Sequence, residues 1–438
     1  MRRIFVLSAI LLIAAVATAA PEPDAWWPQW RGPLGTGAAP AADPPTRWGE
    51  SENLRWKVSI PGRGHASPVV WGDRIYLTTA VPAEQAAVAE PPAPGQRRRG
   101  IAVSGPVRFV VMALDRATGK TVWERTARTE TPHEGTHTDG TWASASAVTD
   151  GARVFAHFGS RGLYAYGADG EKMWQKDLGD MATRNGFGEG ASPALFGEIL
   201  VVNWDHEGAS FIVALDAGSG RELWRRQRDE VTSWSTPLVV ADGERPQVVI
   251  NATGRTRGYD LESGETVWEA AGMTTNTIPS PVYADGLVFV TSGFRGNALQ
   301  AIRLAAARGD LADSEAIAWS YDRDTPYVPS PLLHAGILYV LKSNSGILTA
   351  FDAATGKVHY GPERLPGIDG AYASPVAAGD RIYIPGRDGT TVVLAAGPEF
   401  EVIAENRLDD GFDASPALAG NDLLLRGRGS LYCLSERP

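Results

Sequence analysis

The residues best suited to chemistry in this chain stand in the connections between its apolar segments. Asp205, His206 and Glu207 follow one another in a short loop that separates two apolar runs. Three ionisable groups in succession are more than a turn requires, and binding residues gather on loops that a rigid framework holds in place. We therefore expect this triplet to contribute to a site for a polar ligand, a cation or a peptide.

Other connections carry similar side chains, and we expect them to share one rim of the fold. The predicted rim site consists of Asn185, Glu189, Asp205, His206, Glu207, Asp229, Glu230, Trp234, Arg295, Asp322 and Asp324. Further polar and aromatic residues of these connections are Arg184, Phe187, Arg255, Asn297, Arg323, Tyr327, Asp369, Tyr372, Arg387, Asp409, Asp410 and Asp413. The alternative is that these charges are ordinary solvated loop residues, since loops are polar by default.

One short motif matches a known metal site. The segment from His133 to His137 reads HEGTH, and zinc proteases use this spacing to place two histidines on one face of a helix. Pro132 precedes the segment and Gly135 lies inside it, so we expect a loop and interpret the match as accidental. We predict no metal ligands and no catalytic residues.

Composition and charge exclude several functional classes. The chain has 438 residues with 41 Lys+Arg against 51 Asp+Glu, which gives a net charge of −10. This acidic balance argues against nucleic-acid binding, because phosphate recognition needs a basic face. With Cys433 as the single cysteine, the chain has no internal disulfide and no cysteine-ligated zinc or iron–sulfur site.

The elements that must position these loops repeat along the chain. A Ser-Pro step, or a close variant, begins an apolar strand eight times, at Ser67, Ser146, Ser192, Thr236, Ser280, Ser330, Ser374 and Ser415. The spacings between these anchors are 79, 46, 44, 44, 50, 44 and 41 residues. A period near 44 residues indicates a propeller or a solenoid.

Each unit predicts four antiparallel strands. A tight turn such as Gly72-Asp73 joins the first two strands, and a second tight turn leads into a fourth strand that carries a tryptophan. The predicted docking tryptophans are Trp56, Trp123, Trp174, Trp224, Trp268 and Trp319. We expect each indole to pack against the next unit and to donate its N–H to a neighbouring carbonyl.

The repeats predict an all-β fold, an eight-bladed β-propeller that forms a single domain over residues 53–438. The last unit, from Ser415 to Leu434, supplies only three strands, so a strand around Trp56 near the N-terminus should complete it and close the ring. Residues 20–52 are expected to form an extended segment that lies on the ring. Residues 81–107 are interpreted as a disordered insertion in the first blade.

Residues 1–19 are predicted to be a secretory signal peptide. Arg2 and Arg3 precede an apolar run from Ile4 to Val16, and small residues at Ala17 and Ala19 follow. The run is too short for the roughly 20 residues that span a bilayer, although a retained anchor is the alternative. Without a cysteine near the cleavage site, we expect an exported, soluble monomer, periplasmic or secreted, with no lipid anchor and no transmembrane segment.

The unit Ala-Leu-Asp-x-x-Thr-Gly-Lys-x-x-Trp, from Ala113 to Trp123 and echoed from Ala214 to Trp224, resembles the tryptophan-docking repeat of the quinoprotein, or PQQ-repeat, propellers. This resemblance implies an eight-bladed propeller and two possible functions. One branch consists of PQQ-dependent alcohol and glucose dehydrogenases. The other contains non-enzymatic propellers, such as the lipoprotein of the outer-membrane β-barrel assembly machine. A single cysteine permits neither the vicinal disulfide of the alcohol dehydrogenases nor, at its position, the lipidated cysteine of the lipoprotein.

We therefore expect an exported, non-catalytic propeller that acts as a scaffold or as a module binding a ligand or a protein. A protein partner or a small polar ligand should bind at the loop-rich rim. The alternative is a short quinoprotein dehydrogenase with PQQ and Ca²⁺ in the central funnel, where carboxylate and carbonyl oxygens would suit the cation.

Overall fold

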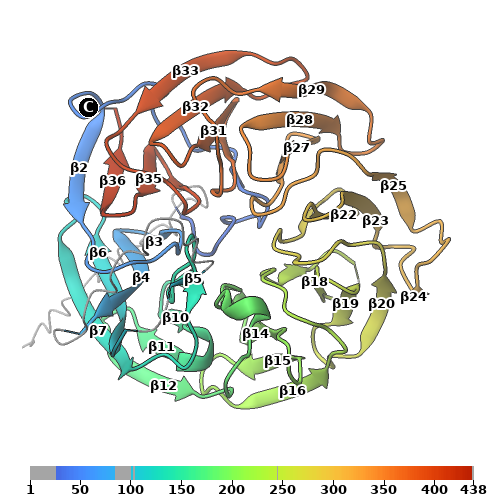
Figure 1. Ribbon diagram of the computed structural model, residues 1–438, viewed down its shortest axis with the longest axis horizontal. Coiled ribbons are helices and arrows are strands. Elements are labelled where there is room, and N and C mark those ends of the chain that lie inside the picture. Colours follow the sequence, from blue (N-terminus) through green and yellow to red (C-terminus); the bar gives the residue numbers. More distant parts are fainter. Residues whose placement is uncertain (1–25, 84–99, 102–103, 244, 437–438) are drawn as a thin grey trace, which may run out of the picture.

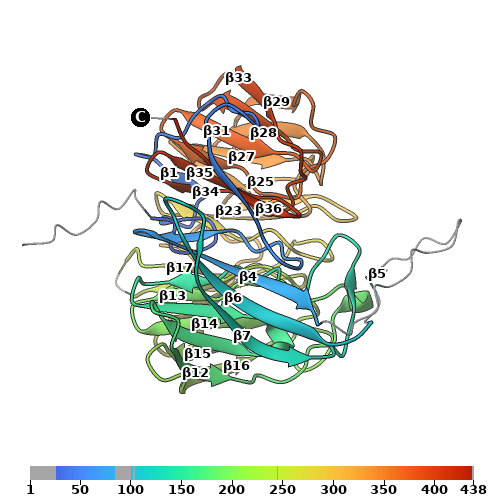
Figure 2. The same cartoon turned by 90° about the vertical axis from the view of Figure 1, so that its left-hand side faces the viewer.

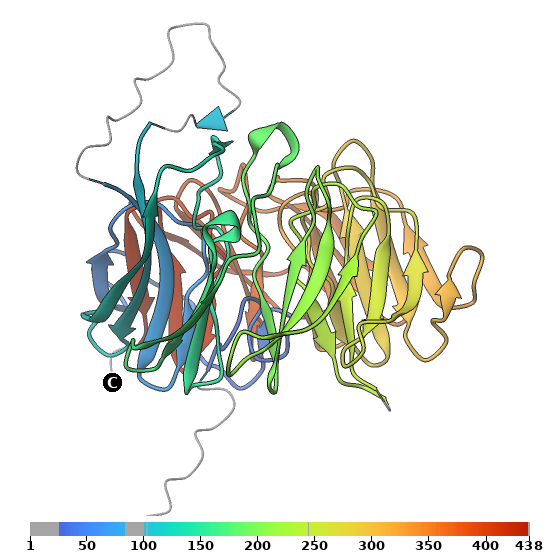
Figure 3. The same ribbon diagram turned by 90° about the horizontal axis from the view of Figure 1, so that it is seen from below.

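The computed structural model describes residues 26–83, 100–101, 104–243 and 245–436. Eight blades, each with four antiparallel strands, stand around a central axis, as predicted (Figure 1). In two blades a short fifth strand is added in parallel. Seen edge-on, the ring is a flat disc (Figures 2 and 3). The expected signal peptide, residues 1–19, lies outside the described residues.

The blades follow one another along the chain, each running from its inner strand to its outer strand. Blade 1 consists of β3 (Val69–Trp71), β4 (Arg74–Pro82), β6 (Val107–Asp115) and β7 (Thr121–Glu130). Blade 2 consists of β9 (Val148–Thr149), β10 (Arg153–His157), β11 (Leu163–Gly167) and β12 (Lys172–Lys176). Blade 3 consists of β13 (Ala194–Phe196), β14 (Ile199–Trp204), β15 (Phe211–Asp216) and β16 (Glu222–Gln227). Blade 4 consists of β17 (Leu238–Val240), β18 (Gln247–Ile250), β19 (Thr256–Asp260) and β20 (Thr266–Ala270).

The second half of the ring repeats this order. Blade 5 consists of β21 (Val282–Ala284), β22 (Leu287–Ser292), β23 (Ala298–Arg303) and β25 (Ile317–Tyr321). Blade 6 consists of β26 (Leu332–His334), β27 (Ile337–Leu341), β28 (Ile347–Asp352) and β29 (Val358–Arg364). Blade 7 consists of β30 (Val376–Ala378), β31 (Arg381–Pro385), β32 (Thr390–Ala395) and β33 (Val402–Arg407). Blade 8 consists of β34 (Ala417–Ala419), β35 (Asp422–Arg426), β36 (Ser430–Leu434) and β2 (Leu54–Ser59).

The ring closes through the N-terminal strand, which confirms that part of the fold prediction. β2 pairs antiparallel with β36, and Trp56 lies opposite Cys433. On the inner side of the same seam, Arg426 of β35 donates from Nη1 to the carbonyl oxygens of Ala66 (3.0 Å) and Thr78 (2.8 Å). The last blade is therefore joined to blade 1 by a buried arginine as well as by the strand that completes it.

The eight repeat anchors form a hydrogen-bonded ladder around the axis. The backbone N–H of each anchor donates to the side-chain hydroxyl of the anchor in the next blade, over seven links between 2.8 and 3.0 Å: Ser67 to Ser146, Ser146 to Ser192, Ser192 to Thr236, Thr236 to Ser280, Ser280 to Ser330, Ser330 to Ser374 and Ser374 to Ser415. The Ser67 hydroxyl is buried and has no partner among the described residues, so the ladder stops at the seam.

Five of the six predicted docking tryptophans contact the following blade. Their indole N–H groups donate to the carbonyls of Arg116, Ala168, Ala217, Leu261 and Ala353 at 2.9–3.0 Å; the donors are Trp56, Trp123, Trp174, Trp224 and Trp319. Each ring also lies against the glycine of the tight turn between the third and fourth strands of that blade. These contacts hold the outer edges of neighbouring blades together.

Trp268 departs from the prediction. Its N–H donates at 2.9 Å to Oε1 of Gln247 in its own blade, and its ring lies over Gly258. The reason is that blade 5 has no tight turn between its last two strands. A longer connection there contains β24 (Gly309–Asp310), which pairs in parallel with β20, so this connection covers the indole in place of a turn.

The N-terminal segment crosses the axis on one face of the ring. Trp27 pairs with Val70 in blade 1, and β1 (Ala38–Ala39) adds in parallel to β30, the inner strand of blade 7. The Arg31 guanidinium is buried and donates to the carbonyl oxygens of Thr36, Pro331 and Pro375 at 2.7–3.0 Å. These bonds tie the segment to the inner strands of blades 6 and 7.

The described residues of the first-blade insertion correct its predicted bounds. β4 extends to Pro82 and β6 begins at Val107, so both strands reach into the range 81–107 that we interpreted as disordered. β5 (Gly100–Ile101) pairs with β8 (Thr136–His137) on the face opposite β1 (Figure 2). Most of the remaining insertion lies outside the described residues.

Substitution of a turn glycine tests the contact between blades. In Gly220→Ala, the new Cβ would lie 2.7 Å from Cε3 of Trp174, and Gly220 has a φ of +71°. Gly336→Ala carries the same backbone strain, with a φ of +75°, but its Cβ meets no atom within 4 Å. We expect Gly220→Ala to lower the free energy of unfolding by about 1–3 kcal/mol more than Gly336→Ala. Urea unfolding measures the stability of both variants. Equal losses of unfolding free energy would contradict close packing of Trp174 against Gly220.

Candidate functional site

A cavity of about 730 Å³ occupies the centre of the ring, on the face that carries β5 and β8. We call it the funnel. Its walls come mainly from the connections that run from the outer strand of one blade to the inner strand of the next. Anchor hydroxyls of Ser146, Ser192, Thr236, Ser374 and Ser415 line its inner part, together with Trp30 of the N-terminal segment.

A second ring of residues lines the funnel beside these hydroxyls, and the sequence analysis did not identify it as a set. The residue two positions before each anchor lines the funnel in all eight units: His65, Ser144, Gly190, Trp234, Ile278, Val328, Tyr372 and Asp413. Alternate residues of an extended chain point to the same side, so anchor and wall residue face the axis together. Counting back two residues from each anchor would have identified this wall.

The acidic side chains of the funnel are already paired with arginines. Asp413 accepts from Nε of Arg387 (2.6 Å) and from Arg428 (3.2 Å), and Asp139 accepts from Nη2 of Arg387 at 2.7 Å. Tyr372 donates to Asp139 at 3.1 Å and lies under the Arg387 guanidinium. Burial opposes ionisation of Asp139, but the hydrogen bonds from Arg387 and Tyr372 outweigh it and lower the pKa of this carboxyl.

Two arginines of the funnel have no acidic partner within the described part of the chain. Arg184 lies in the helical turn η3 (Arg184–Gly186), where its backbone N–H donates to the Thr232 hydroxyl and its carbonyl oxygen accepts from Phe187. Arg295 lies with its guanidinium 5.3 Å from the centre of the Phe294 ring, and Phe294 in turn stacks on Tyr327. The available charge of the funnel is therefore positive. Of the predicted rim residues, Asn185, Glu189 and Trp234 also line it.

The triplet Asp205-His206-Glu207, which the sequence favoured most, does not line this cavity. Asp205 and Arg228 form a fully buried ion pair of 2.7 Å, and the Ser233 hydroxyl also donates to Asp205 at 2.6 Å. Although burial opposes the charge of Arg228, the neighbouring Asp205 raises the pKa of the guanidinium. The structure gives Asp205 the role of compensating a buried arginine.

His206 and Glu207 accept hydrogen bonds from neighbouring connections. Nδ1 of His206 accepts from the backbone N–H of Ala182 at 3.1 Å. Glu207 accepts from the hydroxyl of Thr232 at 2.7 Å and from its backbone N–H. Both residues hold one loop to the next, and neither lines the funnel.

The remaining predicted rim residues are spread over blades 4 to 6. Asp229 and Glu230 both pair with Arg257, and Glu230 also accepts from the backbone N–H groups of Gly254 and Arg255. Asp324 pairs with Lys342 at 2.8 Å, and Asp322 is exposed. None of these four acids lines the funnel.

The HEGTH segment forms no helix: it contains a bend followed by the two-residue strand β8. His133 contacts the carbonyl oxygen of Met181 (2.8 Å), and Glu134 accepts from Thr183. Among the described residues, no group of three or more His, Cys, Asp or Glu side chains is arranged to hold a metal ion.

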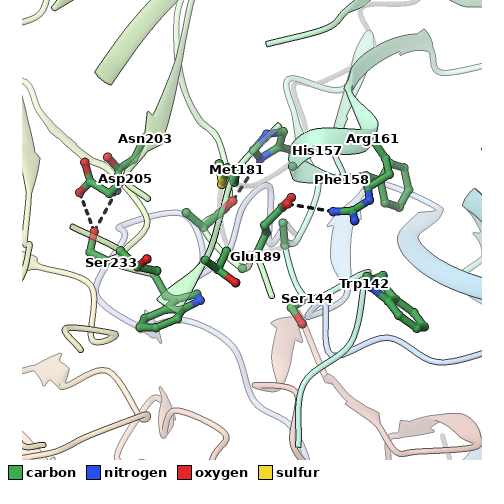
Figure 4. Close-up of a pocket in the computed structure, with 17 residues that line it drawn as sticks. Trp142, Ser144, His157, Phe158, Arg161, Met181, Glu189, Asn203, Asp205 and Ser233 are labelled. Atoms are coloured by element: carbon green, nitrogen blue, oxygen red, sulfur yellow. Dashed lines mark hydrogen bonds and ion pairs between the residues drawn. The ribbon is translucent and has the colours of Figure 1, made fainter. Parts of the chain in front are cut away.

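A much smaller cavity of about 20 Å³ lies beside the funnel (Figure 4). Its walls include the ion pair of Glu189 with Arg161, 2.8 Å long, and the buried side chains of His157 and Asn203. Nε2 of His157 and Oδ1 of Asn203 have no hydrogen-bond partner among the described residues. A space of this size and polarity suits a single water molecule.

One known family covers most of this chain. A family model described as outer membrane protein assembly factor BamB matches residues 47–185, 107–359 and 208–437, which together span most of the chain. The chain belongs to this family. A curated BamB from Francisella salina is 29% identical over 102 residues, a match that covers 23% of this chain and only 18% of that protein.

Solved structures show the same fold at low identity. BamB from Moraxella catarrhalis superposes with a TM-score of 0.56 at 15% identity, covering 87% of this chain and 96% of that one. The quinohemoprotein alcohol dehydrogenase ADHIIG from Pseudomonas putida HK5 gives 0.58 at 12% identity, covering 95% and 82%. At these identities the likeness establishes the propeller fold, and function has to be argued from the residues of the site.

The Asp205–Arg228 pair predicts a large effect of a small change. Asp205→Asn leaves a buried guanidinium without its counter-charge, which should cost about 3–5 kcal/mol of unfolding free energy. The control is Glu222→Gln, which breaks the half-exposed 2.8 Å pair with Arg225 and should cost less than about 1 kcal/mol. Chemical denaturation compares the two variants, and a small loss for Asp205→Asn would mean that the pair is not structural.

Proposed function

We propose that this chain is an exported, non-catalytic propeller of the BamB-like family that binds a protein partner through its funnel. The observation that carries the proposal is the construction of the funnel. It is a cavity of about 730 Å³, walled by connections from all eight blades, with aromatic side chains and two arginines free to receive a ligand. Pockets of this size and mixed character are the usual places of specific binding.

Two further observations support a binding role. The buried acids around the funnel, including Glu189 and Asp205, form hydrogen-bonded ion pairs with arginines. Such pairs hold a binding surface rigid from behind. The matching family model and the curated relative carry the name outer membrane protein assembly factor, which describes work on other proteins. A monomer exported by a cleaved signal peptide would meet such a partner in the periplasm or outside the cell. Among the described residues, no helix is both long and apolar enough to cross a membrane.

Site-specific photo-crosslinking tests the proposal. A photo-reactive amino acid replaces Ile278, which lines the funnel, or Val122, a 46%-exposed residue on the outer strand β7 that serves as the control. In cells that export the full chain, we expect the Ile278 position to give an adduct with one discrete protein, identified by mass spectrometry. The Val122 position should not give it. Equal labelling from both positions, or none from Ile278, would count against the funnel as the binding surface.

The second candidate is the short quinoprotein dehydrogenase, which the free arginines of the funnel favour. The arginines and Trp234 suit an anionic aromatic group such as PQQ. The carboxylates of the funnel do not suit Ca²⁺, because Asp139, Asp413 and Glu189 are paired with arginines and the described residues contain no metal-binding acidic group.

A titration separates the candidates. Purified protein is supplied with PQQ and Ca²⁺, and alcohol- or glucose-dependent reduction of a dye is followed by absorbance. We expect no turnover up to high micromolar quinone, because the residues do not form the cation site. Saturable quinone binding accompanied by turnover would replace the binding proposal with the enzyme.

A further inference from the structure

We infer that the segment bound in the funnel is an acidic peptide, an inference that rests on the proposed protein-binding function. Charge is the first argument. The chain carries a net charge of −10, yet the groups left unpaired in its central cavity are the guanidinium groups of Arg184 and Arg295. Most of the surface of this acidic protein repels an acidic segment, whereas the arginines of the funnel attract it. The charge distribution therefore directs an acidic segment to the funnel.

A buried acceptor supplies a second, independent argument. Asn276 is 3% exposed and lines the funnel, where its side chain interacts with the Tyr327 hydroxyl. Its Oδ1 has no hydrogen-bond partner among the described residues. A buried carbonyl oxygen left without a donor is costly, so its position favours a ligand that brings an N–H or O–H group. A backbone amide of a peptide is such a donor, whereas a simple inorganic anion is not.

The aromatic walls define the third feature. Phe294 and Tyr327 stack with ring centres 4.8 Å apart, and Trp234 and Ile278 lie on neighbouring positions of the wall. These surfaces suit apolar or aromatic side chains between the acidic ones. Arg184 precedes blade 3, whereas Arg295 belongs to a connection inside blade 5. One carboxylate of a peptide can therefore meet each arginine, while the intervening residues lie along the wall.

Selection from a random peptide library tests the expected composition of the bound peptide. Phage-displayed heptapeptides are selected on the immobilised full-length mature chain, and the enriched pool is sequenced. We expect Asp and Glu to be enriched over Lys and Arg, together with at least one aromatic residue. The affinity of a synthetic consensus peptide is then measured by fluorescence anisotropy at low and high salt. It should fall at high salt, because exposed charges are screened.

Peptide affinities of matched variants test whether binding takes place in the funnel. Arg184→Ala and Arg295→Ala should each lower the affinity for the peptide by about tenfold or more, which is the range expected for the loss of a charged hydrogen bond. Asn276→Ala should lower the affinity for the peptide at both salt concentrations. The control is Arg245→Ala, which removes the same charge from an 83%-exposed arginine in the turn between β17 and β18, outside the funnel. It should leave the affinity unchanged, and circular dichroism checks that every variant is folded.

The outcomes distinguish the two proposals. Enriched peptides that are neutral or basic, but lose affinity in Trp234→Ala, would overturn the acidic ligand and leave protein binding in the funnel standing. Acidic peptides that bind Arg184→Ala and Arg295→Ala as well as the parent protein would also overturn the inference. If no peptide is enriched and citrate alone binds in an Arg184- and Arg295-dependent manner, the ligand is a small carboxylate, and the protein-binding proposal fails with it.

Discussion

The ladder of anchor hydroxyls around the axis is the constraint on which the rest of this structure depends. Each link joins the backbone of one blade to a side chain of the next at 2.8–3.0 Å, close to the centre of the ring. A single hydrogen bond of this kind contributes only about 1 kcal/mol net. Seven of them fix the separation and rotation of neighbouring blades at their inner edges, while the tryptophans fix the outer edges. The seam is the exception, and there Arg426 and β2 replace the missing link.

The same ladder determines what the funnel can contain. Because each anchor is held in one orientation, the residue two positions earlier must face the axis, whatever its chemistry. The repeat therefore offers eight equivalent wall positions, and function resides in how they differ. His65, Trp234, Tyr372 and Asp413 are chemically distinct, although their backbone positions correspond. Burial lowers the pKa of His65 to about 4, so this wall residue is neutral at physiological pH and adds no charge to the funnel.

The fold could be predicted from the sequence because its causes are local and recur. The anchors, the tight turns and five of the tryptophans recur at equivalent positions of each repeat and make equivalent contacts. Trp268 broke the rule because its partner turn lies in the next blade, where a longer connection with β24 replaces it. The candidate site was harder to predict for a related reason. A carboxylate such as Asp205 looks the same in sequence whether it faces solvent or a buried arginine, and its partner Arg228 stands 23 residues away. Asn276 gave no signal in the sequence, since the unpaired buried Oδ1 that distinguishes it is visible only in the structure.

The N-terminal segment changes what the ring can do. An open propeller offers its axis to ligands from both faces. Here the segment runs across the inner strands of one face, and Arg31 binds three carbonyl oxygens there, two of them at the starts of β26 and β30. Trp30 beside it forms part of the lining of the funnel. The axis therefore becomes a cup with its mouth on the β5–β8 face. A ligand that enters must come from that face, where Arg184 and the connection bearing Asp139 stand, and it meets the hydroxyl ladder and Trp30 at the bottom. This geometry favours the end or a tight bend of a chain over a segment that threads through the ring.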